Sequence, residues 1–181
     1  MTLWFLIIFL LLLFVIAVWL YNRLVRQRNI VAEAWAGIDV QLTRRADLIP
    51  NLVEMVKGYQ TYEASVLEDV TRARGDAADH PETRARRENR LTDHIVKLFA
   101  LAEAYPDLKA SDTFRDLHES LVEVEDQLQY ARRYYNGAVR DLNNRVESFP
   151  DMLIAQPFGF SSAEFFEIQF ASQRQSPKVE L

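Results

Sequence analysis

The sequence contains no cysteine, and this absence excludes several kinds of chemistry. A chain without cysteine has no disulfide bond, no thiol nucleophile, no cysteine-ligated zinc site and no lipidated N-terminal cysteine. Glycine and proline are also scarce, with 5 and 6 among 181 residues. This composition favours an ordered, helix-rich chain over a disordered one.

Residues 1–21 lack charge as well, so the net charge of −5 belongs entirely to the rest of the chain. A mildly acidic domain is a poor nucleic-acid binder by default, and we expect no nucleic-acid partner. By length, the remainder is one domain. We predict a helical bundle at residues 22–172 and a flexible tail at 173–181.

The run from Leu3 to Tyr21 is apolar and contains no glycine or proline. As a helix rising about 1.5 Å per residue it would span about 28 Å, close to the hydrocarbon thickness of a bilayer. Aromatic rings prefer the headgroup level, and they stand at both ends of the run, at Trp4, Phe5, Trp19 and Tyr21. The sequence therefore predicts a transmembrane anchor at 3–21. A cleaved signal peptide is disfavoured, because no Lys or Arg precedes the run and no small-residue cleavage site follows it.

Arg23, Arg26 and Arg28 follow the anchor directly. Positive charge beside a membrane span stays on the cytoplasmic side. We therefore predict a single-pass protein of the inner (cytoplasmic) membrane, with its N-terminus outside and its bundle in the cytoplasm. The lipid bilayer is the first expected partner.

The rest of the chain repeats apolar residues in alternating steps of three and four. One such stripe begins at Leu24 and continues to Ala73, and two more lie within residues 91–105 and 114–149. A period of 3.5 keeps apolar side chains on one seam of a helix, so that helices pack side by side at shallow angles. We predict an all-α fold in which the transmembrane helix continues into a bundle of long, coiled-coil-like antiparallel helices.

Turn signals divide this region into four predicted helices, at residues 22–74, 82–104, 112–148 and 161–170. Pro50 lies inside the first of them. An interior proline removes a hydrogen bond and clashes with the preceding turn, yet the apolar stripe keeps its phase across Pro50. We therefore predict one long helix with a kink at Pro50 rather than two helices.

No familiar catalytic or metal-binding pattern is present. A carboxylate-bridged metal pair in a bundle needs two Glu-x-x-His units, and no glutamate stands three residues before His80, His94 or His118. The sequence also lacks the His-Glu-x-x-His zinc motif, a glycine-rich phosphate loop and a nucleophile elbow. We predict that the protein is no enzyme and has no cofactor, metal ligand or catalytic residue.

Three charged residues lie on the apolar seams, namely Arg45, Glu63 and Arg145. Burying an unpaired charge costs several kcal/mol, so these side chains need partners or water. One interpretation is interhelical polar contact, or a seam that opens to solvent at these points. The other is a ligand or ion site, which Asp39 and Asp47 would join.

Two further clusters have alternative interpretations. The basic residues Arg84, Arg86, Arg87 and Arg90 form either a solvated helix face or a contact for phosphate or an acidic partner. The second cluster is aromatic and either caps the end of the bundle or docks another subunit, a partner or the membrane surface. It comprises Phe158, Phe160, Phe165, Phe166 and Phe170.

The chain resembles the LemA family over most of its length. The resemblance rests on the anchor, Tyr21-Asn22, residues 38–42, Arg44-Arg45, and residues 47–53, 56–59, 103–110, 132–136 and 149–150. It implies a membrane-anchored bundle of long helices and brings no established catalytic activity. Some relatives have a lipidation cysteine after the hydrophobic stretch, which this chain lacks. Others are encoded beside membrane metalloproteases, which hints at membrane quality control.

Two functions remain open. The first is a non-enzymatic scaffold at the bacterial membrane that associates with itself as a homo-oligomer. The second is an adapter or regulator of another membrane protein, such as a membrane protease. A small-ligand or metal-binding bundle is a third, disfavoured alternative, because no pattern of ligands supports it.

Overall fold

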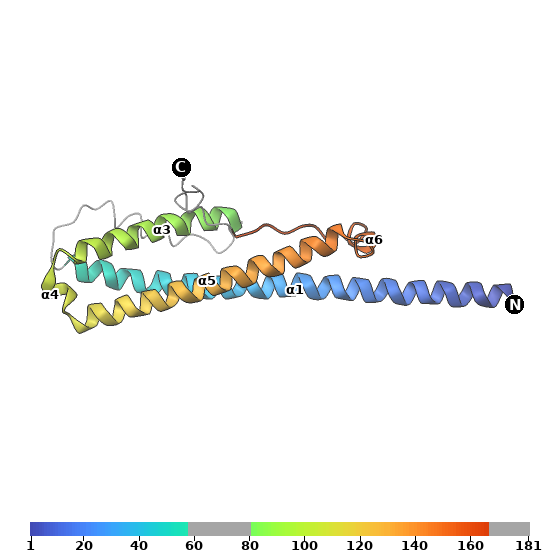
Figure 1. Cartoon of the computed structure of the whole chain (residues 1–181), viewed down its shortest axis with the longest axis horizontal. Helices are drawn as coiled ribbons and strands as arrows, with labels where there is room; N and C mark the ends of the chain where they lie inside the picture. Colours follow the sequence, from blue (N-terminus) through green and yellow to red (C-terminus); the bar gives the residue numbers. More distant parts are fainter. Residues whose placement is uncertain (58–80, 167–181) are drawn as a thin grey trace, which may run out of the picture. The chain divides into compact units, whose positions relative to one another are not determined.

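A computed structural model of the chain describes residues 1–57 and 81–166. About 85% of these residues are helical, and none of them lies in a strand, which confirms the all-α prediction. The helices are shown in Figure 1: α1 (Thr2–Lys57), α3 (Pro81–Ala102), α4 (Pro106–Lys109), α5 (Asp112–Glu147) and α6 (Met152–Ala155). The predicted end of the first helix at residue 74 lies outside the described residues.

Local sequence explains several of the helix ends. α3 and α4 begin at Pro81 and Pro106, where the missing N–H of proline costs no intrahelical hydrogen bond. α5 begins at Asp112, whose negative charge is favourable at a helix N-terminus. It ends at Glu147, shortly before Pro150, which cannot continue a helix.

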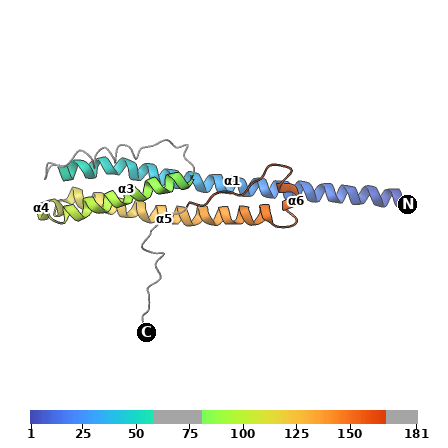
Figure 2. The same cartoon turned by 90° about the horizontal axis from the view of Figure 1, so that it is seen from above.

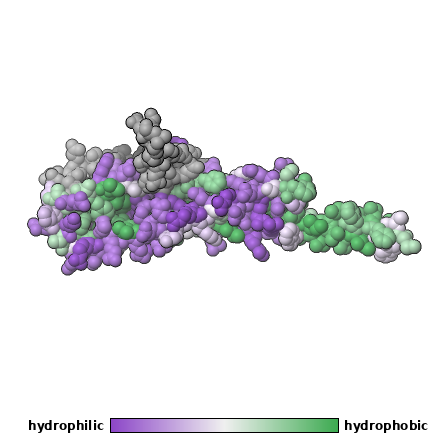
Figure 3. All heavy atoms as spheres, viewed as in Figure 1, coloured by the Kyte–Doolittle hydropathy of each residue, from purple (hydrophilic) through white to green (hydrophobic). Residues whose placement is uncertain are grey.

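α1 is one helix from Thr2 to Lys57, and Pro50 lies inside it. Its N-terminal part is apolar and projects without any other described element beside it (Figures 1 and 3). The large hydrophobic side chains there are exposed from Leu3 to Trp19. By length and composition, α1 can cross a membrane. The apolar run therefore continues into the bundle within one helix.

The chain divides into two compact units, and α1 and α5 each contribute to both. Unit 1 consists of residues 1–38 and 131–165, and unit 2 of residues 39–130 with the C-terminal residues. In unit 2, the described parts of α1, α3, α4 and α5 share one hydrophobic core. Its buried members are Ile49, Leu52, Val53, Val56, Leu91, Ile95, Leu98, Ala102, Leu108, Phe114, Leu117 and Leu121.

Unit 1 is built mainly from α1 and α5, which lie antiparallel. The rings of Trp35 and Tyr135 lie 5.3 Å apart between centroids, and Gln27 Nε2 donates to Ala138 O at 3.3 Å. Beyond α5 the chain turns back through α6, which lies beside α1 in both views (Figures 1 and 2). A small core joins them, formed by Leu24, Ala155 and Phe160, with Val25, Val146 and Ile154 packed against it.

The structure differs from the predicted helix at 161–170, because residues 161–166 are not helical. Side chains of α5 form hydrogen bonds with backbone N–H and C=O groups that would pair with one another in a helix. Asn143 accepts the N–H of Ala163 at 2.8 Å and donates to its carbonyl at 3.0 Å. The hydroxyl of Tyr135 donates to the carbonyl of Glu164 at 2.9 Å. The rest of the predicted helix, residues 167–170, lies outside the described residues.

Candidate functional site

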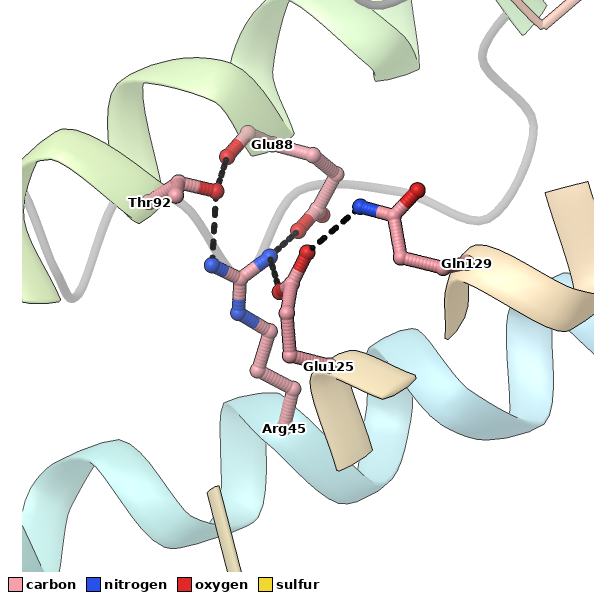
Figure 4. A network of polar contacts seen from close by, with 5 residues as sticks. All are labelled: Arg45, Glu88, Thr92, Glu125 and Gln129. Atoms are coloured by element: carbon pink, nitrogen blue, oxygen red, sulfur yellow. Dashed lines mark hydrogen bonds and ion pairs between the residues drawn. The ribbon is translucent and has the colours of Figure 1, made fainter. Parts of the chain in front are cut away.

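The most buried charge network of unit 2 centres on Arg45, whose side chain is only 3% exposed (Figure 4). Its Nη2 donates to Thr92 Oγ1 at 2.7 Å. Its Nη1 lies 3.7 Å from Glu88 Oε2 and 3.5 Å from Glu125 Oε2. Arg45 belongs to α1, Thr92 and Glu88 to α3, and Glu125 to α5. One guanidinium therefore connects three helices.

The partners of Arg45 are themselves held in place. The Thr92 hydroxyl, which accepts from Arg45, donates to the backbone carbonyl of Glu88 at 3.0 Å. Gln129 Nε2 donates to Glu125 Oε1 at 3.0 Å, one turn along α5. A buried ion pair is tolerated only when hydrogen bonds and opposite charges replace the lost water. Arg45 Nη2 has such a hydrogen bond, whereas Nη1 faces two opposite charges without a hydrogen bond to any described residue. These contacts favour one register of the three helices.

A second ion pair links α1 and α3 in unit 2, where Arg84 Nη2 donates to Asp39 Oδ1, whose side chain is 41% exposed. Arg84 is buried, as is Glu88 on the same helix. The interpretation of the basic cluster as a solvated face is therefore wrong at Arg84. The partners of these two residues, Asp39 and Arg45, lie on the neighbouring helix, so charge complementarity explains their burial. Arg86 is exposed and Arg87 is partly buried.

The remaining seam charges have different surroundings. Arg145 belongs to unit 1 and is partly buried, and its Nε has no hydrogen-bond partner within residues 1–57 and 81–166. Glu63 lies outside the described residues. Asp47, a member of the alternative ligand site, is exposed on α1. The structure thus brings Arg45 together with Glu88 and Glu125, which sequence reasoning did not select.

The second notable site lies in unit 1, where the apolar run of α1 ends. The ring of Tyr21 lies 5.1 Å from the Phe158 ring and 5.8 Å from the Phe160 ring, both in edge-on geometry. The guanidinium of Arg28 lies over Phe160 at 5.2 Å from its centroid. Cation–π contacts of this kind hold a positive charge against an aromatic face.

Arg23 makes two contacts at the same site. Its guanidinium lies 5.2 Å from the centroid of Trp19, on the preceding turn of α1. Its Nη1 lies 4.0 Å from Asp151 Oδ2, and the Asp151 side chain is buried. The other predicted anchor residues, Trp4, Phe5 and Arg26, are exposed on α1.

The structure divides the predicted aromatic patch. Phe160 and Phe166 are buried, whereas Phe158 and Phe165 are exposed. Phe170 lies outside the described residues. Sequence reasoning missed two other exposed apolar residues near α6, Phe149 and Leu153. The sequence feature that could have revealed them is the absence of any charged residue other than Asp151 between residues 149 and 160.

The Tyr135 hydroxyl in unit 1 has a raised pKa. Burial raises the pKa of its hydroxyl above the usual 10.0, and the nearby negative charge of Glu164 raises it further. Both causes disfavour the phenolate. The hydroxyl therefore remains a hydrogen-bond donor to the chain at Glu164.

Within the described residues, no group of three or more His, Cys, Asp or Glu side chains could hold a metal ion. In unit 2 the His118 ring packs edge-on against Phe99, with 4.6 Å between centroids. Among the described residues, the two sites consist of ion pairs, hydrogen bonds and aromatic contacts.

Comparison with known proteins gives the family. Residues 34–181 match the sequence profile of the LemA family. The chain belongs to the LemA family. The Protein LemA of Metamycoplasma hominis is 25% identical over 149 residues, which cover 81% of this chain and 68% of that protein.

Other relatives are magnetosome proteins. MamQ 2 of Paramagnetospirillum magneticum is 34% identical over 73 residues, and MamQ of Magnetospirillum gryphiswaldense is 29% identical over 72 residues. Each match covers 40% of this LemA-family chain. The chain spans only about a quarter of these relatives, at 27% and 26% of their lengths. Its family and its apolar N-terminal helix together indicate a membrane-associated helical protein.

Proposed function

We propose that the protein is a non-enzymatic, single-pass scaffold of the bacterial cytoplasmic membrane, and that its bundles associate with one another in the plane of the membrane. The observation that carries this proposal is the continuity of α1, which has no break between the apolar run and the helix of unit 1. A helix transmits the direction of the membrane span to the bundle, whereas a flexible tether would not. Copies held in one orientation can repeat the same contact with their neighbours.

The chemistry of the buried charges supports a structural role. Arg45 pairs with Glu88 and Glu125, and Arg84 pairs with Asp39. These contacts join helices and leave the guanidinium of Arg45 almost without exposed surface. A charge engaged in this way stabilises a particular helix register rather than binding a substrate.

In this proposal the N-terminus is outside and the bundle is in the cytoplasm. The support is the group of Arg23, Arg26 and Arg28, which follows the apolar run and is exposed on α1. A single cysteine at Tyr134 on α5 would report the sidedness, because the natural chain has none. A membrane-impermeant thiol reagent is expected to label it in intact cells only after permeabilisation. Labelling without permeabilisation would show that the bundle lies outside the cytoplasm, which contradicts the proposed orientation.

Crosslinking in native membranes tests self-association. Single cysteines at the exposed residues Val40, Val96, Val122 and Tyr134 sample α1, α3 and α5. A cysteine at Val139, which is fully buried on α5, is the matched control. Homodimer crosslinks at one or more exposed positions, absent at Val139, are expected. Monomer alone at all four exposed positions would refute the scaffold.

The same experiment addresses the adapter function. A crosslink to one different membrane protein, in stoichiometric yield and without homodimer, would replace the scaffold by an adapter or regulator of that protein. A membrane protease would be the first partner to examine by mass spectrometry of the crosslinked band.

A further inference from the structure

The segment that follows α5 has an unusual distribution of polarity. We call residues 149–160 the α6 loop. Its large apolar residues Phe149, Leu153 and Phe158 are 76%, 57% and 61% exposed. Its single charged residue, Asp151, is buried and faces Arg23. A loop in water normally turns its charge outward and its apolar side chains inward, so the polarity of the α6 loop is inverted.

The position of the α6 loop within unit 1 accounts for this inversion. Phe158 contacts Tyr21, the last residue of the apolar run. Ala155 and Phe160 pack on Leu24, one turn further along α1. The loop therefore lies at the height where α1 leaves its apolar section, and Figure 3 shows apolar surface next to the bare helix there.

The buried contacts hold the loop in this position. Ala155, Phe160 and Ile154 face the α1 helix, and Asp151 is paired with Arg23 on the same helix. Phe149, Leu153 and Phe158 lie on the remaining surface of the loop, to which the loop itself contributes no charged residue. A surface of this kind, held beside a membrane span, matches the boundary between lipid headgroups and acyl chains.

We infer that the α6 loop inserts Phe149, Leu153 and Phe158 into the bilayer that α1 crosses, as a second contact with the membrane. Apolar groups that lie in the interface reach about 5–10 Å into the headgroup–acyl boundary. The occupant of this surface is lipid, because the surface continues the lipid-facing surface of α1 through Tyr21 and Phe158. The inference rests on the membrane span of the proposed function and is independent of self-association.

A two-point contact has a mechanical effect. A single span leaves a protein free to rotate about the span, because every rotation exposes the same kind of surface to lipid. A loop inserted on one side of α1 gives unit 1 one preferred tilt in the membrane. This preferred tilt would present the same side of unit 1 at the same height in every copy.

Depth-dependent quenching tests the inference on the full-length protein in lipid vesicles. The chain has no cysteine, so one substitution places one fluorescent label. Leu153→Cys is the reporter, and Tyr134→Cys is the control because both residues are 57% exposed. Tyr134 lies about 20 Å along α5 from its end at Glu147, at about 1.5 Å per residue. Phe14→Cys, in the apolar run, reports whether α1 itself is in lipid.

Lipids with a quencher near the top of the acyl chain are expected to remove most of the fluorescence at Leu153→Cys and Phe14→Cys and little at Tyr134→Cys. Aqueous iodide is expected to show the opposite order. Phe149→Cys provides a second reporter on the loop, and circular dichroism verifies that each labelled variant retains its helices.

Three results would overturn the inference. Strong iodide quenching at Leu153→Cys without lipid quenching would place the loop in water. Protection from both quenchers would place it against a protein. Absence of lipid quenching at Phe14→Cys would remove the membrane span itself, and the scaffold proposal with it, whereas failure at the loop alone leaves that proposal intact.

Discussion

The Nη1 atom of Arg45 lies 3.7 Å from Glu88 Oε2, and both side chains are less than a tenth exposed. Next to Arg45 in sequence, Arg44 pairs with Glu123 at 3.3 Å, but these two side chains are about half exposed. The two arginines therefore form the same kind of ion pair in different solvent environments. The comparison separates the effect of burial from the effect of charge.

Replacement of Arg45 by alanine is expected to destabilise the bundle strongly. The change removes the Arg45 guanidinium from the buried Glu88, and breaking a buried ion pair costs about 3–5 kcal/mol. Arg44→Ala is the matched control, since an exposed pair contributes about 0–1 kcal/mol. Chemical unfolding followed by circular dichroism in detergent measures both. Equal losses in the two variants would contradict a buried, charge-paired role for Arg45.

Asn143 is expected to hold the chain at residues 161–166. Asn143→Ala removes both hydrogen bonds to the backbone of Ala163, each contributing about 0.5–1.5 kcal/mol. The amides of this segment should then exchange hydrogen faster than in the natural protein, as measured by mass spectrometry. Asn144→Ala alters the exposed neighbour on α5 and should leave the exchange unchanged. Unaltered exchange in Asn143→Ala would mean that other contacts hold the segment.

Tyr135 gives an alkaline pH dependence whose sign follows from its raised pKa. In the folded protein the hydroxyl keeps its proton at a pH where the unfolded chain, with a pKa near 10.0, has released it. The stabilisation is therefore complete below pH 10 and is lost as the pH rises through the higher pKa of the folded state.

Tyr135→Phe should accordingly lose stability at neutral pH by about 1 kcal/mol, because the hydrogen bond to Glu164 is gone. Above pH 10 its stability should fall less steeply than that of the natural protein. Tyr134→Phe, at the exposed neighbouring position, should keep the natural slope. Unfolding curves collected over this pH range give the free energy of unfolding of each protein. If it falls equally steeply with pH in all three proteins, Tyr135 is not the source of the pH dependence.

The continuity of α1 can be tested by two insertions between Tyr21 and Asn22. Seven helix-forming residues add about two turns and keep the phase of the helix, whereas seven glycine and serine residues create a flexible joint. Both insertions place the same number of added residues between Tyr21 and the rest of unit 1. Homodimer crosslinking at the exposed bundle positions should survive the helical insertion and decline with the flexible one. Equal crosslinking would show that assembly needs no rigid connection.

Sequence periodicity was sufficient to predict the all-α fold, with its long N-terminal helix, and the position of Arg45 on a packed seam. A charged residue on an apolar seam can be recognised from the sequence alone, because the repeat of apolar residues defines the seam. The partner Glu88 did not stand out, because it lies within a cluster of arginines. Its burial depends on how α3 is rotated against α1, which is a tertiary relation that neither helix encodes alone.

At residues 161–166 the sequence predicted a helix that the structure does not contain. Ser161 and Ser162 are good helix-capping residues, and aromatic residues follow at helical spacing. The backbone instead pairs with Asn143 and Tyr135, which lie about 20 and 29 residues earlier in the chain. Local propensity is weak compared with such contacts. The split between buried Phe160 and exposed Phe158 is likewise tertiary, because Phe160 packs in the small core with Leu24 and Ala155.

The α6 loop also makes unit 1 unequal across the bilayer. α1 displaces lipid from both leaflets, whereas Phe149, Leu153 and Phe158 would displace lipid from one leaflet only. Each copy then has a wedge-shaped cross-section, and wedges relieve packing stress in a bent membrane but add to it in a flat one. Higher protein density on small vesicles than on large ones would reveal this preference, and equal density would exclude it. Membrane curvature would thus become a signal that the protein reads through the short α6 loop.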